Sequence, residues 1–368
     1  MTHPVRRPSA RVVVVNWRQA ELTIRAARSI REQLGDGDVL VVVDNASGDG
    51  SAERLRREGL TVVESSENRG FGAGVNLGAL GMKEEVLVLL NNDAVAEPGF
   101  LEALLAALSN PPSAVAPAAA TARILLAGRW KPAAPGQPDA LVSPRTGRWT
   151  RVDDEAAARG EGEVLVNSTG NLVDASGNGY DRDWLVPAGQ EHSPSEVFGL
   201  CGGACSIRRE AWQALGGFRE DLFMYYEDTD LSWRLRERGW RVIYVREAVA
   251  RHDHASSSGT DSPMFIRVNV RNRILTAAAH SPAPVVMQAL ARTLVRSLRG
   301  PQRGPVLRGL AQALAGLPRD LRDRLGARQQ HLQAGQHQIG RADHKHAVDD
   351  IIQIFLGPLA RPDAGNKA

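Results

Sequence analysis

Short apolar runs alternate with segments of helical spacing in the first hundred residues, and this alternation constrains the fold more than any other feature. Residues 11–17 (RVVVVNW) are a β-branched run, residues 20–35 have helical spacing, and residues 38–51 are an apolar run that ends in turn residues. The alternation continues to residues 85–93 (EVLVLLNND). Continuous apolar strands joined by helices are typical of a parallel sheet covered on both faces. We therefore expect an α/β fold with a mainly parallel central sheet.

Polar side chains end these expected strands. Asn16 ends the first run, Asp44 ends the second, and Asn91 to Asp93 follow the apolar residues 86–90. In such sheets, ligands bind beyond the carboxyl ends of the strands. A carboxylate placed there by a buried strand, as Asp93 is, suits a divalent cation, whose octahedron diphosphate oxygens and water would complete. We expect a ligand site at this edge.

Three other segments could carry chemistry, and each also has an ordinary structural explanation. YYEDTD places Glu227, Asp228 and Asp230 near a helix start, where the helix dipole favours acids, and we interpret Asp230 as such a structural acid. His252 and His254 bracket a candidate ligand site, although loop histidines are often simply solvated. The glycine-rich residues 68–78 differ from the dinucleotide fingerprint and follow the second helix, so they indicate close backbone approach to a nucleotide, not a Rossmann site.

Composition argues against several classes of protein. Only four consecutive valines precede Asn16, too few for the apolar region of a secretory signal, and no run approaches the roughly 18 apolar residues of a membrane span. The two cysteines, Cys201 and Cys205, stand in CGGAC, whose spacing fits neither a zinc knuckle nor a disulfide framework. We expect a reducing cytoplasm as the location.

Basic charge is concentrated towards the C-terminus. Residues 267–328 carry 12 Arg, no Lys and two Asp, a net charge of +10, although the formal charge of the chain is +3. Leu290 and Leu294 fall on one side of a helix there, and Arg292 and Arg296 on the other. This pattern is typical of helices that lie on an anionic membrane surface, and the lack of interleaved aromatic residues argues against nucleic acid. Alternatively, the leucines pack on the rest of the protein and the arginines are solvated.

These patterns divide the chain into four parts. We expect an N-terminal arm over residues 1–10, the α/β domain over residues 11–262, a basic amphipathic helical segment over residues 263–328 and a flexible tail over residues 329–368. Within the domain, residues 110–162 are rich in Pro, Ala, Gly and Arg with weak periodicity. They are expected to form the remnant of a helix and a long, variable surface excursion with little chemistry.

The motifs, in this order, resemble the inverting glycosyltransferases of family 2, in the subgroup that includes bacterial rhamnosyltransferases. The resemblance spans about residues 11–260 and rests on VVVVNW, VDNASGDGS, NRGFGAGVNLG, LLNNDA, NSTGN with GYDRDW, GGAC, LGGF, FMYYEDTDLSWRLRERGW and HDHASSSG. It implies the GT-A nucleotide-sugar fold, which agrees with the alternation of strands and helices. The QxxRW sequence of processive relatives is absent, so the transfer of one sugar per encounter is implied.

The resemblance also implies roles for the matched positions. Asp228 would be the general base, and Asp93 with His252 would hold Mg²⁺ or Mn²⁺. Apart from the resemblance, Glu227 stands next to the base in sequence and could orient it or contact the acceptor. Asn91 and Asn92 replace carboxylates that many members carry in the DXD triplet, which should weaken metal binding without nucleotide. The implied acceptor or sugar pocket consists of Gly202, Gly203 and Trp233. The implied donor-binding residues are Asn16, Asp44 on the nucleobase, Asn45, Asn68, Gly70, Gly72, Asn76, Asn91 and Asn92.

The expected function is inverting transfer of a sugar, with dTDP-rhamnose as the leading donor, to a hydroxyl of a glycan or polyprenyl-linked glycan in the cytoplasm or at the inner face of the membrane. One base and no separate nucleophile imply direct displacement. Two alternatives remain: a noncatalytic nucleotide-sugar-binding or scaffold protein, and a sugar nucleotidylyltransferase. The first predicts loss of Asp228 or Asp93, and both are present. The second needs a glycine-rich phosphate loop after the first strand, and VVVVNWRQAE has none.

Overall fold

The structure is a computed structural model that describes residues 6–109, 117–137, 139–253, 262–299 and 302–335. The strands are β1 (Ala10–Asn16), β2 (Val39–Asp44), β3 (Val62–Glu64), β4 (Val86–Leu90), β5 (Ala94–Ala96), β6 (Ala119–Leu126), β7 (Trp130–Pro132), β8 (Leu141–Ser143), β9 (Gly147–Arg151), β10 (Val166–Ser168), β11 (Asn171–Val173), β12 (Gly179–Asp181), β13 (Glu196–Val197), β14 (Ala204–Arg208) and β15 (Val242–His252). The helices are α1 (Ala20–Arg31), α2 (Ser51–Arg57), α3 (Phe71–Gly78), α4 (Phe100–Ser109), α5 (Asp154–Ala158), α6 (Arg209–Leu215), the 3-10 helix η1 (Glu220–Leu222), α7 (Glu227–Glu237), α8 (Pro263–His280), α9 (Ala283–Arg299) and α10 (Arg303–Gly335).

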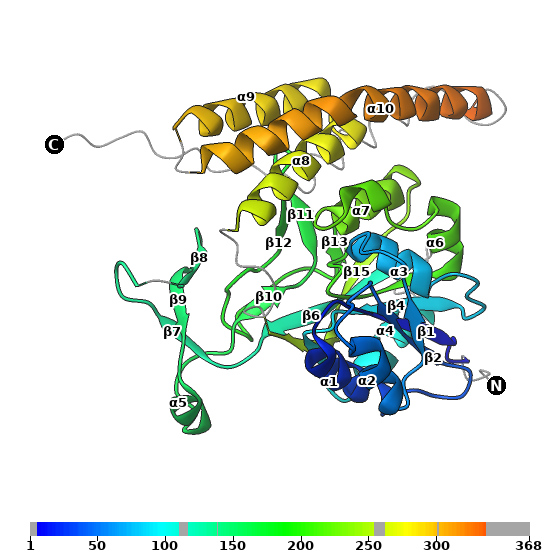
Figure 1. The fold of residues 1–368 in the computed structure, drawn as a ribbon, viewed down its shortest axis with the longest axis vertical. Helices are drawn as coiled ribbons and strands as arrows, with labels where there is room; N and C mark the ends of the chain where they lie inside the picture. Colours follow the sequence, from blue (N-terminus) through cyan, green and yellow to red (C-terminus); the bar gives the residue numbers. More distant parts are fainter. Residues whose placement is uncertain (1–5, 110–116, 138, 254–261, 300–301, 336–368) are drawn as a thin grey trace.

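A mixed sheet with strand order β13-β15-β6-β14-β4-β1-β2-β3 runs through the centre of the α/β domain (Figure 1). β1 is parallel to both β2 and β4, β2 is parallel to β3, and β6 is parallel to β15, whereas β14 runs antiparallel between β4 and β6. The carboxyl ends of β1, β2 and β4 therefore meet at one edge, where Asn16 lies beside Asp44 in register. The expected α/β fold with a mainly parallel central sheet is confirmed.

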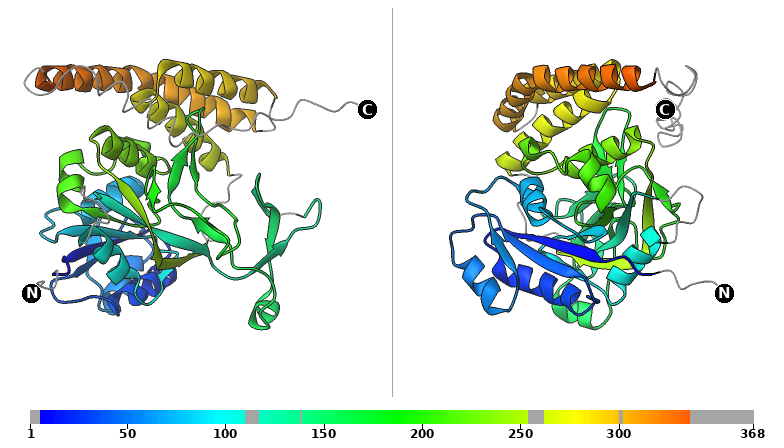
Figure 2. Two further views of the ribbon diagram at one scale, coloured as in Figure 1. Left: turned by 180° about the vertical axis from the view of Figure 1, so that it is seen from behind. Right: turned by 90° about the vertical axis from the view of Figure 1, so that its right-hand side faces the viewer.

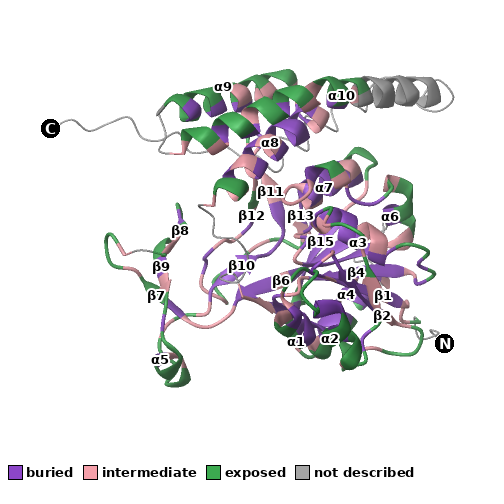
Figure 3. Ribbon diagram, in the orientation of Figure 1, coloured by how far each residue is buried: buried purple, intermediate pink, exposed green. Residues whose placement is uncertain are grey.

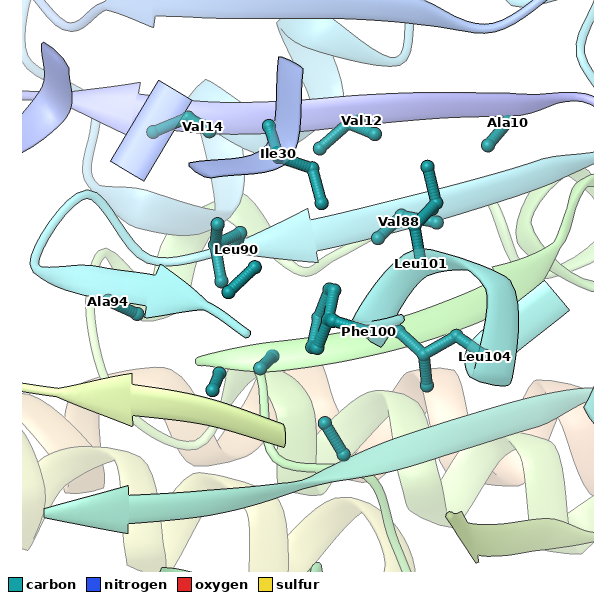
Figure 4. Packing of buried hydrophobic residues seen from close by; sticks show 14 of the residues in the cluster. Ala10, Val12, Val14, Ile30, Val88, Leu90, Ala94, Phe100, Leu101 and Leu104 are labelled. Carbon is teal, nitrogen blue, oxygen red and sulfur yellow. The ribbon is translucent and has the colours of Figure 1, made fainter. Parts of the chain in front are cut away.

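Two apolar clusters cover the two faces of this sheet. On one face, Val12 packs with Ile30 of α1 and Phe100 of α4 (Figure 4). On the other, Val13 packs with Val75 of α3. Because successive side chains of a strand point to opposite faces, an unbroken run of valines is buried on both sides. The continuous apolar runs of the sequence are thus explained by helices on both faces.

Residues 110–162 are more ordered than a surface excursion. β6 lies inside the central sheet, between β14 and β15, and nearly all of its side chains are buried. Three of its first four residues are alanines, whose small apolar surface gives little periodic signal. β7, β9 and β8 form a separate sheet that projects with α5 from the main body (Figures 1 and 2). The expected surface excursion is therefore wrong for residues 119–126, while residues 110–116 lie outside the described part.

α8, α9 and α10 form a helical layer beside the α/β domain (Figures 1 and 2). Ile266, Val270 and Ile274 of α8 pack with Val306 and Ala313 of α10. The predicted C-terminal helices are confirmed, and α10 continues past residue 328 into the expected tail. The rest of that tail, from residue 336, lies outside the described residues. Within the described chain, every helix is too short or too polar to cross a membrane.

Buried ion pairs join this helical layer to α7. His280 of α8 contacts Asp230 through Nε2 at 3.0 Å and Glu237 through Nδ1 at 2.8 Å. Arg234 also donates to Asp230, at 2.7 Å. Burial alone would lower the pKa of His280, but the hydrogen bonds and charges of Asp230 and Glu237 raise it to about 9. Asp230 is thus a structural acid, as its position in the first helical turn suggested.

We expect His280→Gln to lower the melting temperature at neutral pH. A rise of the pKa from 6.5 to about 9 corresponds to roughly 3 kcal/mol, because each pKa unit is worth about 1.4 kcal/mol. The pKa is raised on folding, so this stabilisation is present in full below about pH 6.5 and is lost as the pH rises through about 9. Thermal unfolding from pH 6 to 10 measures it, with exposed His192→Gln as the control. A stability gap that stayed constant over this range would contradict the assignment.

Candidate active site

Asp228 lies in the first turn of α7 with its carboxylate fixed by backbone donors. The amide of Gly202 donates to Oδ2 at 3.0 Å, and the amide of Thr229 donates to Oδ1 at 2.6 Å. Burial raises the pKa of Asp228, while the hydrogen bonds from Gly202 and Thr229 oppose the shift. A carboxylate that is desolvated yet held in one orientation has the properties of a general base.

Glu227 is buried beside Asp228. Burial and the charge of Asp228 raise the pKa of Glu227 to about 8. Its Oε2 has no hydrogen-bond partner among the described residues. Glu227 therefore keeps its proton to a higher pH than an ordinary glutamate does, and the two carboxylates lose their protons as a coupled pair.

The loop before α7 has an unusual backbone that a residue of α8 holds. Phe223, Tyr225 and Tyr226 all have φ between 66° and 73°, a left-handed conformation that costs each non-glycine residue about 1 kcal/mol or more. The buried amide of Asn272 donates to the carbonyls of residues 222, 224 and 225 at 2.7 to 2.9 Å. Sequence reasoning missed Asn272, because an asparagine inside an apolar helix signals a buried partner without identifying it.

Asp93 and His252 form the candidate metal site. His252 Nε2 lies 2.9 Å from Asp93 Oδ1, and His252 Nδ1 lies 2.7 Å from Asn167 Oδ1. Burial alone would lower the pKa of His252, but the hydrogen bond and charge of Asp93 raise it. Because Asn167 can only accept through Oδ1, a neutral His252 carries its proton on Nδ1 and presents the lone pair of Nε2 towards Asp93.

One carboxylate and one imidazole nitrogen, the latter oriented by Asn167, suit Mg²⁺ or Mn²⁺ if a bound diphosphate supplies further oxygens. Among the described residues, no group of three or more His, Cys, Asp or Glu side chains forms a complete protein site. The donor set therefore fits a cation shared with a ligand. His254 lies outside the described residues.

The predicted nucleotide-binding residues lie at the ends of β1 and β2. Asn16 donates to Asp44 Oδ1 at 2.6 Å, and Ser47 also hydrogen-bonds to the Asp44 carboxylate. Asn45 donates to Asn68 Oδ1 at 3.1 Å and to the carbonyl of Gly70 at 3.0 Å. These bonds brace the loops after both strands, and contact with a nucleobase stays a prediction for Asp44.

Gly70 brings the glycine-rich loop against the loop before α7. Its φ is 90°, and a Cβ on it would lie 1.8 Å from the carbonyl oxygen of Phe223. Gly72 lies next to Glu227: a Cβ on Gly72 would be 3.7 Å from the Cβ of Glu227. The predicted donor loop and the predicted base thus belong to one site, which only glycine at position 70 permits.

The segment Gly202–Gly203 links the base to the end of β4. Gly202 binds Asp228, and the amide of Asn91 donates to the carbonyl of Gly203 at 2.8 Å. Asn92 lies 3.4 Å from Gln19 and from Thr23. The carboxyl edge of the sheet and the start of α7 therefore meet at these glycines.

Two predicted residues lie apart from this cluster. The amide of Asn76 is engaged with Phe218 and Glu220, at 3.0 Å each. The indole of Trp233 is buried, edge-on to Phe198 and stacked on His280. In this structure both side chains hold elements together, and their roles in ligand binding stay predictions.

Sequence comparison gives two family matches and a curated relative. Residues 11–152 match Glycosyl transferase family 2, and residues 160–276 match Glycosyl transferase family group 2. The chain is 28% identical to the N-acetylglucosaminyl-diphospho-decaprenol L-rhamnosyltransferase of Mycobacterium tuberculosis over 260 residues. The aligned region covers 66% of this chain and 75% of that protein. The matches cover the span over which the motifs resemble family 2.

Two solved structures share part of the course of the chain. A mannosyltransferase from Pyrobaculum calidifontis, in complex with GDP-Man and Mn²⁺, has a TM-score of 0.47 and 18% identity over 85% of this chain and 87% of its own. The glucosyl-3-phosphoglycerate synthase of Mycobacterium tuberculosis, in complex with Mn²⁺, uridine diphosphate and glucosyl-3-phosphoglycerate, has a TM-score of 0.44 and 16% identity over 74% and 79%.

Proposed function

The chain belongs to glycosyl transferase family 2, and from this premise we propose that it transfers one sugar, with inversion, from a nucleoside diphosphate to an acceptor hydroxyl. The observation that carries the proposal is the oriented carboxylate of Asp228, linked through Gly202 and Gly203 to the strand end that bears Asp93. This arrangement supports a base at one end of a bound sugar and a diphosphate at the other.

Asp228 takes the proton of the acceptor hydroxyl as its oxygen attacks the anomeric carbon. The new glycosidic bond forms while the bond to the diphosphate oxygen breaks, and the nucleoside diphosphate leaves from the opposite face. A divalent cation held by Asp93 and His252 would neutralise the charge that builds on the departing diphosphate. The raised pKa of Glu227 disfavours a second negative charge beside Asp228, which supports the assignment of Asp228 as the base.

We propose dTDP-rhamnose as the donor and a polyprenyl-diphosphate-linked sugar as the acceptor. The support is the 28% identity to an enzyme whose name describes L-rhamnose transfer to N-acetylglucosaminyl-diphospho-decaprenol. Such an acceptor would place the enzyme in the cytoplasm, at the inner face of the membrane.

A screen of nucleoside-diphosphate sugars tests the donor. Thermal shift and slow hydrolysis of dTDP-, UDP- and GDP-sugars are measured with Mg²⁺, with Mn²⁺ and with EDTA. We expect dTDP-rhamnose to give the largest shift, and only with metal. If no nucleotide sugar bound in any condition, the proposed activity would be wrong.

α9 and α10 support a membrane-facing role, because they expose many large apolar side chains, although Val306 and Leu310 pack against α8. α9 buries Ala289, Thr293 and Ser297. The outward faces of both helices are exposed in Figure 3. The exposed apolar side chains are Met287, Leu294, Val295, Leu298, Leu307, Leu314 and Leu321. A core-facing helix would bury these residues, so solvation of the arginines alone does not explain the pattern.

The charge of this outward face is positive. Arg292, Arg296, Arg303 and Arg308 are exposed. Among the described side chains of α9 and α10, the single carboxylate is Asp320, which is buried and paired with Arg219. Apolar and cationic side chains together favour the surface of an anionic membrane, where each basic side chain is worth about 1 kcal/mol.

We expect the intact protein to float with anionic vesicles at low salt and to be released at high salt. Truncation near residue 265 would remove Asn272 and disturb the loop before α7, so substitution is the sharper test. Leu294→Gln with Leu298→Gln should reduce flotation severalfold, whereas Leu80→Gln, at a side chain 75% exposed in the α/β domain, should not. An intact protein that stayed with the soluble fraction at low salt would rule out the membrane role.

A further inference from the structure

The hairpin of β11 and β12 turns one face towards the start of α7. Asn171 and Asp181 are paired across the hairpin, so their side chains share a face. Asn171 Nδ2 donates to Thr229 Oγ1 at 3.0 Å. A Cβ on Gly179 would lie 2.8 Å from the same hydroxyl oxygen. Because alternate residues of a strand face the same side, Asp181 also faces the first turn of α7.

Asp181 is a partly buried carboxylate that the proposed chemistry has not used. The side chains of Ser168 and Cys201 hydrogen-bond to it. Burial and the charge of Asp228 raise the pKa of Asp181 to about 6, against the opposing effects of the Ser168 and Cys201 hydrogen bonds and of His252. Asp181 is therefore close enough to both the candidate base and the candidate metal site to feel their charges, and it remains mostly ionised at pH 7.

The proposed function fixes the two ends between which the transferred sugar must lie. In the proposed function, on which this inference rests, the diphosphate lies at Asp93 and His252, and the attacked anomeric carbon lies near Asp228. The ring of the transferred sugar must span the distance between these two ends. Asp181 shares its hairpin face with Asn171, which binds Thr229 next to Asp228, and it contacts Ser168, the neighbour of the Asn167 that binds His252.

We propose that Asp181 accepts a hydrogen bond from a hydroxyl of the transferred sugar and thereby contributes to the choice of donor. An ionised carboxylate accepts hydrogen bonds strongly and cannot donate them. A carboxylate held in a fixed position therefore favours a sugar that places a hydroxyl within its reach. Asn171, bound to Thr229, holds the hairpin against α7 and keeps this acceptor in place.

The test separates binding of the sugar from binding of the nucleotide. Affinities for dTDP and for dTDP-L-rhamnose are measured by calorimetry for the intact protein, Asp181→Asn and Asp181→Ala. We expect the affinity for dTDP to stay within about twofold, whereas Asp181→Ala weakens dTDP-L-rhamnose about tenfold to a hundredfold, as for loss of a charge-assisted hydrogen bond. Tyr180→Phe is the matched control, because its exposed side chain belongs to the same hairpin and faces the other side.

Deoxy donors identify the contact. A series of dTDP-sugars is used, each of which lacks one hydroxyl of rhamnose. One member of the series should bind the parent more weakly than dTDP-L-rhamnose does. Asp181→Ala should bind that one sugar and dTDP-L-rhamnose with equal affinity. Equal weakening of dTDP and dTDP-L-rhamnose would overturn the inference, and so would unchanged discrimination or an effect confined to the KM of the acceptor. If the parent bound no nucleotide sugar, the proposed function itself would fail, which is a different outcome.

Discussion

Asp228→Asn is expected to lower the rate of sugar transfer by about a hundredfold to ten-thousandfold, since a positioned base typically contributes that much. The amide has the size of the carboxylate, so the fold and donor binding should be preserved, although its single oxygen can keep only one of the two hydrogen bonds from Gly202 and Thr229. Initial rates and donor affinity measure the two effects separately. Glu247→Gln, at an exposed carboxylate, is the matched control.

The pH dependence gives the same residue a second test. Burial raises the pKa of Asp228, and a base works only when ionised, so transfer should fall as the pH drops through this raised pKa. An ordinary aspartate has a pKa of about 4. The acid limb of kcat should therefore lie at a higher pH than that value. Near-normal turnover of Asp228→Asn, or an acid limb at ordinary aspartate values, would remove Asp228 from the mechanism.

Asp93→Ala is expected to weaken binding of dTDP in Mg²⁺ or Mn²⁺ and to lower kcat/KM for transfer by roughly a hundredfold or more, because a metal supplies several kcal/mol to a charged transition state. The substitution removes one of two candidate ligands and leaves His252 without its 2.9 Å partner. Calorimetry of dTDP binding with each cation, and bound metal by elemental analysis, provide readouts independent of turnover.

Removal of the cation should reproduce this effect in the parent. EDTA should abolish most transfer, and added Mn²⁺ or Mg²⁺ should restore it, while Asp93→Ala should respond little to either. Asp36→Ala, at an exposed carboxylate on the surface, should behave like the parent. Full activity in EDTA with no bound metal would show that Asp93 and His252 form a structural ion pair.

The sequence could predict those parts of the site that follow directly from a strand or a helix start. β1, β2 and β4 are read from their apolar runs, and their polar ends identify Asn16, Asp44 and Asp93. Asp228 stands in the first turn of α7, as its motif indicated. Each depends on local pattern and on the rule that ligands bind beyond parallel strands.

Residues whose role arises from tertiary contact could not be predicted. Asn272 acts on a loop about fifty residues earlier in the chain, and Asp181 reaches the site because β11 and β12 pack on α7. The periodicity of α9 suggested a buried leucine stripe or a membrane face, and only burial showed that Leu294 and Leu298 are exposed. Partners distant in sequence leave no local periodic signal.

The central claim is direct displacement by an acceptor hydroxyl with Asp228 as the base, and the anomeric configuration of the product tests it most directly. The intact protein is incubated with dTDP-β-L-rhamnose, a polyprenyl-diphosphate-linked N-acetylglucosamine and Mn²⁺. The one-bond coupling between the anomeric carbon and its proton is then read by NMR. The account predicts an α-linked rhamnosyl product that forms with the parent and not with Asp228→Asn. A β-linked product, or a rhamnosyl group covalently attached to the protein, would contradict it.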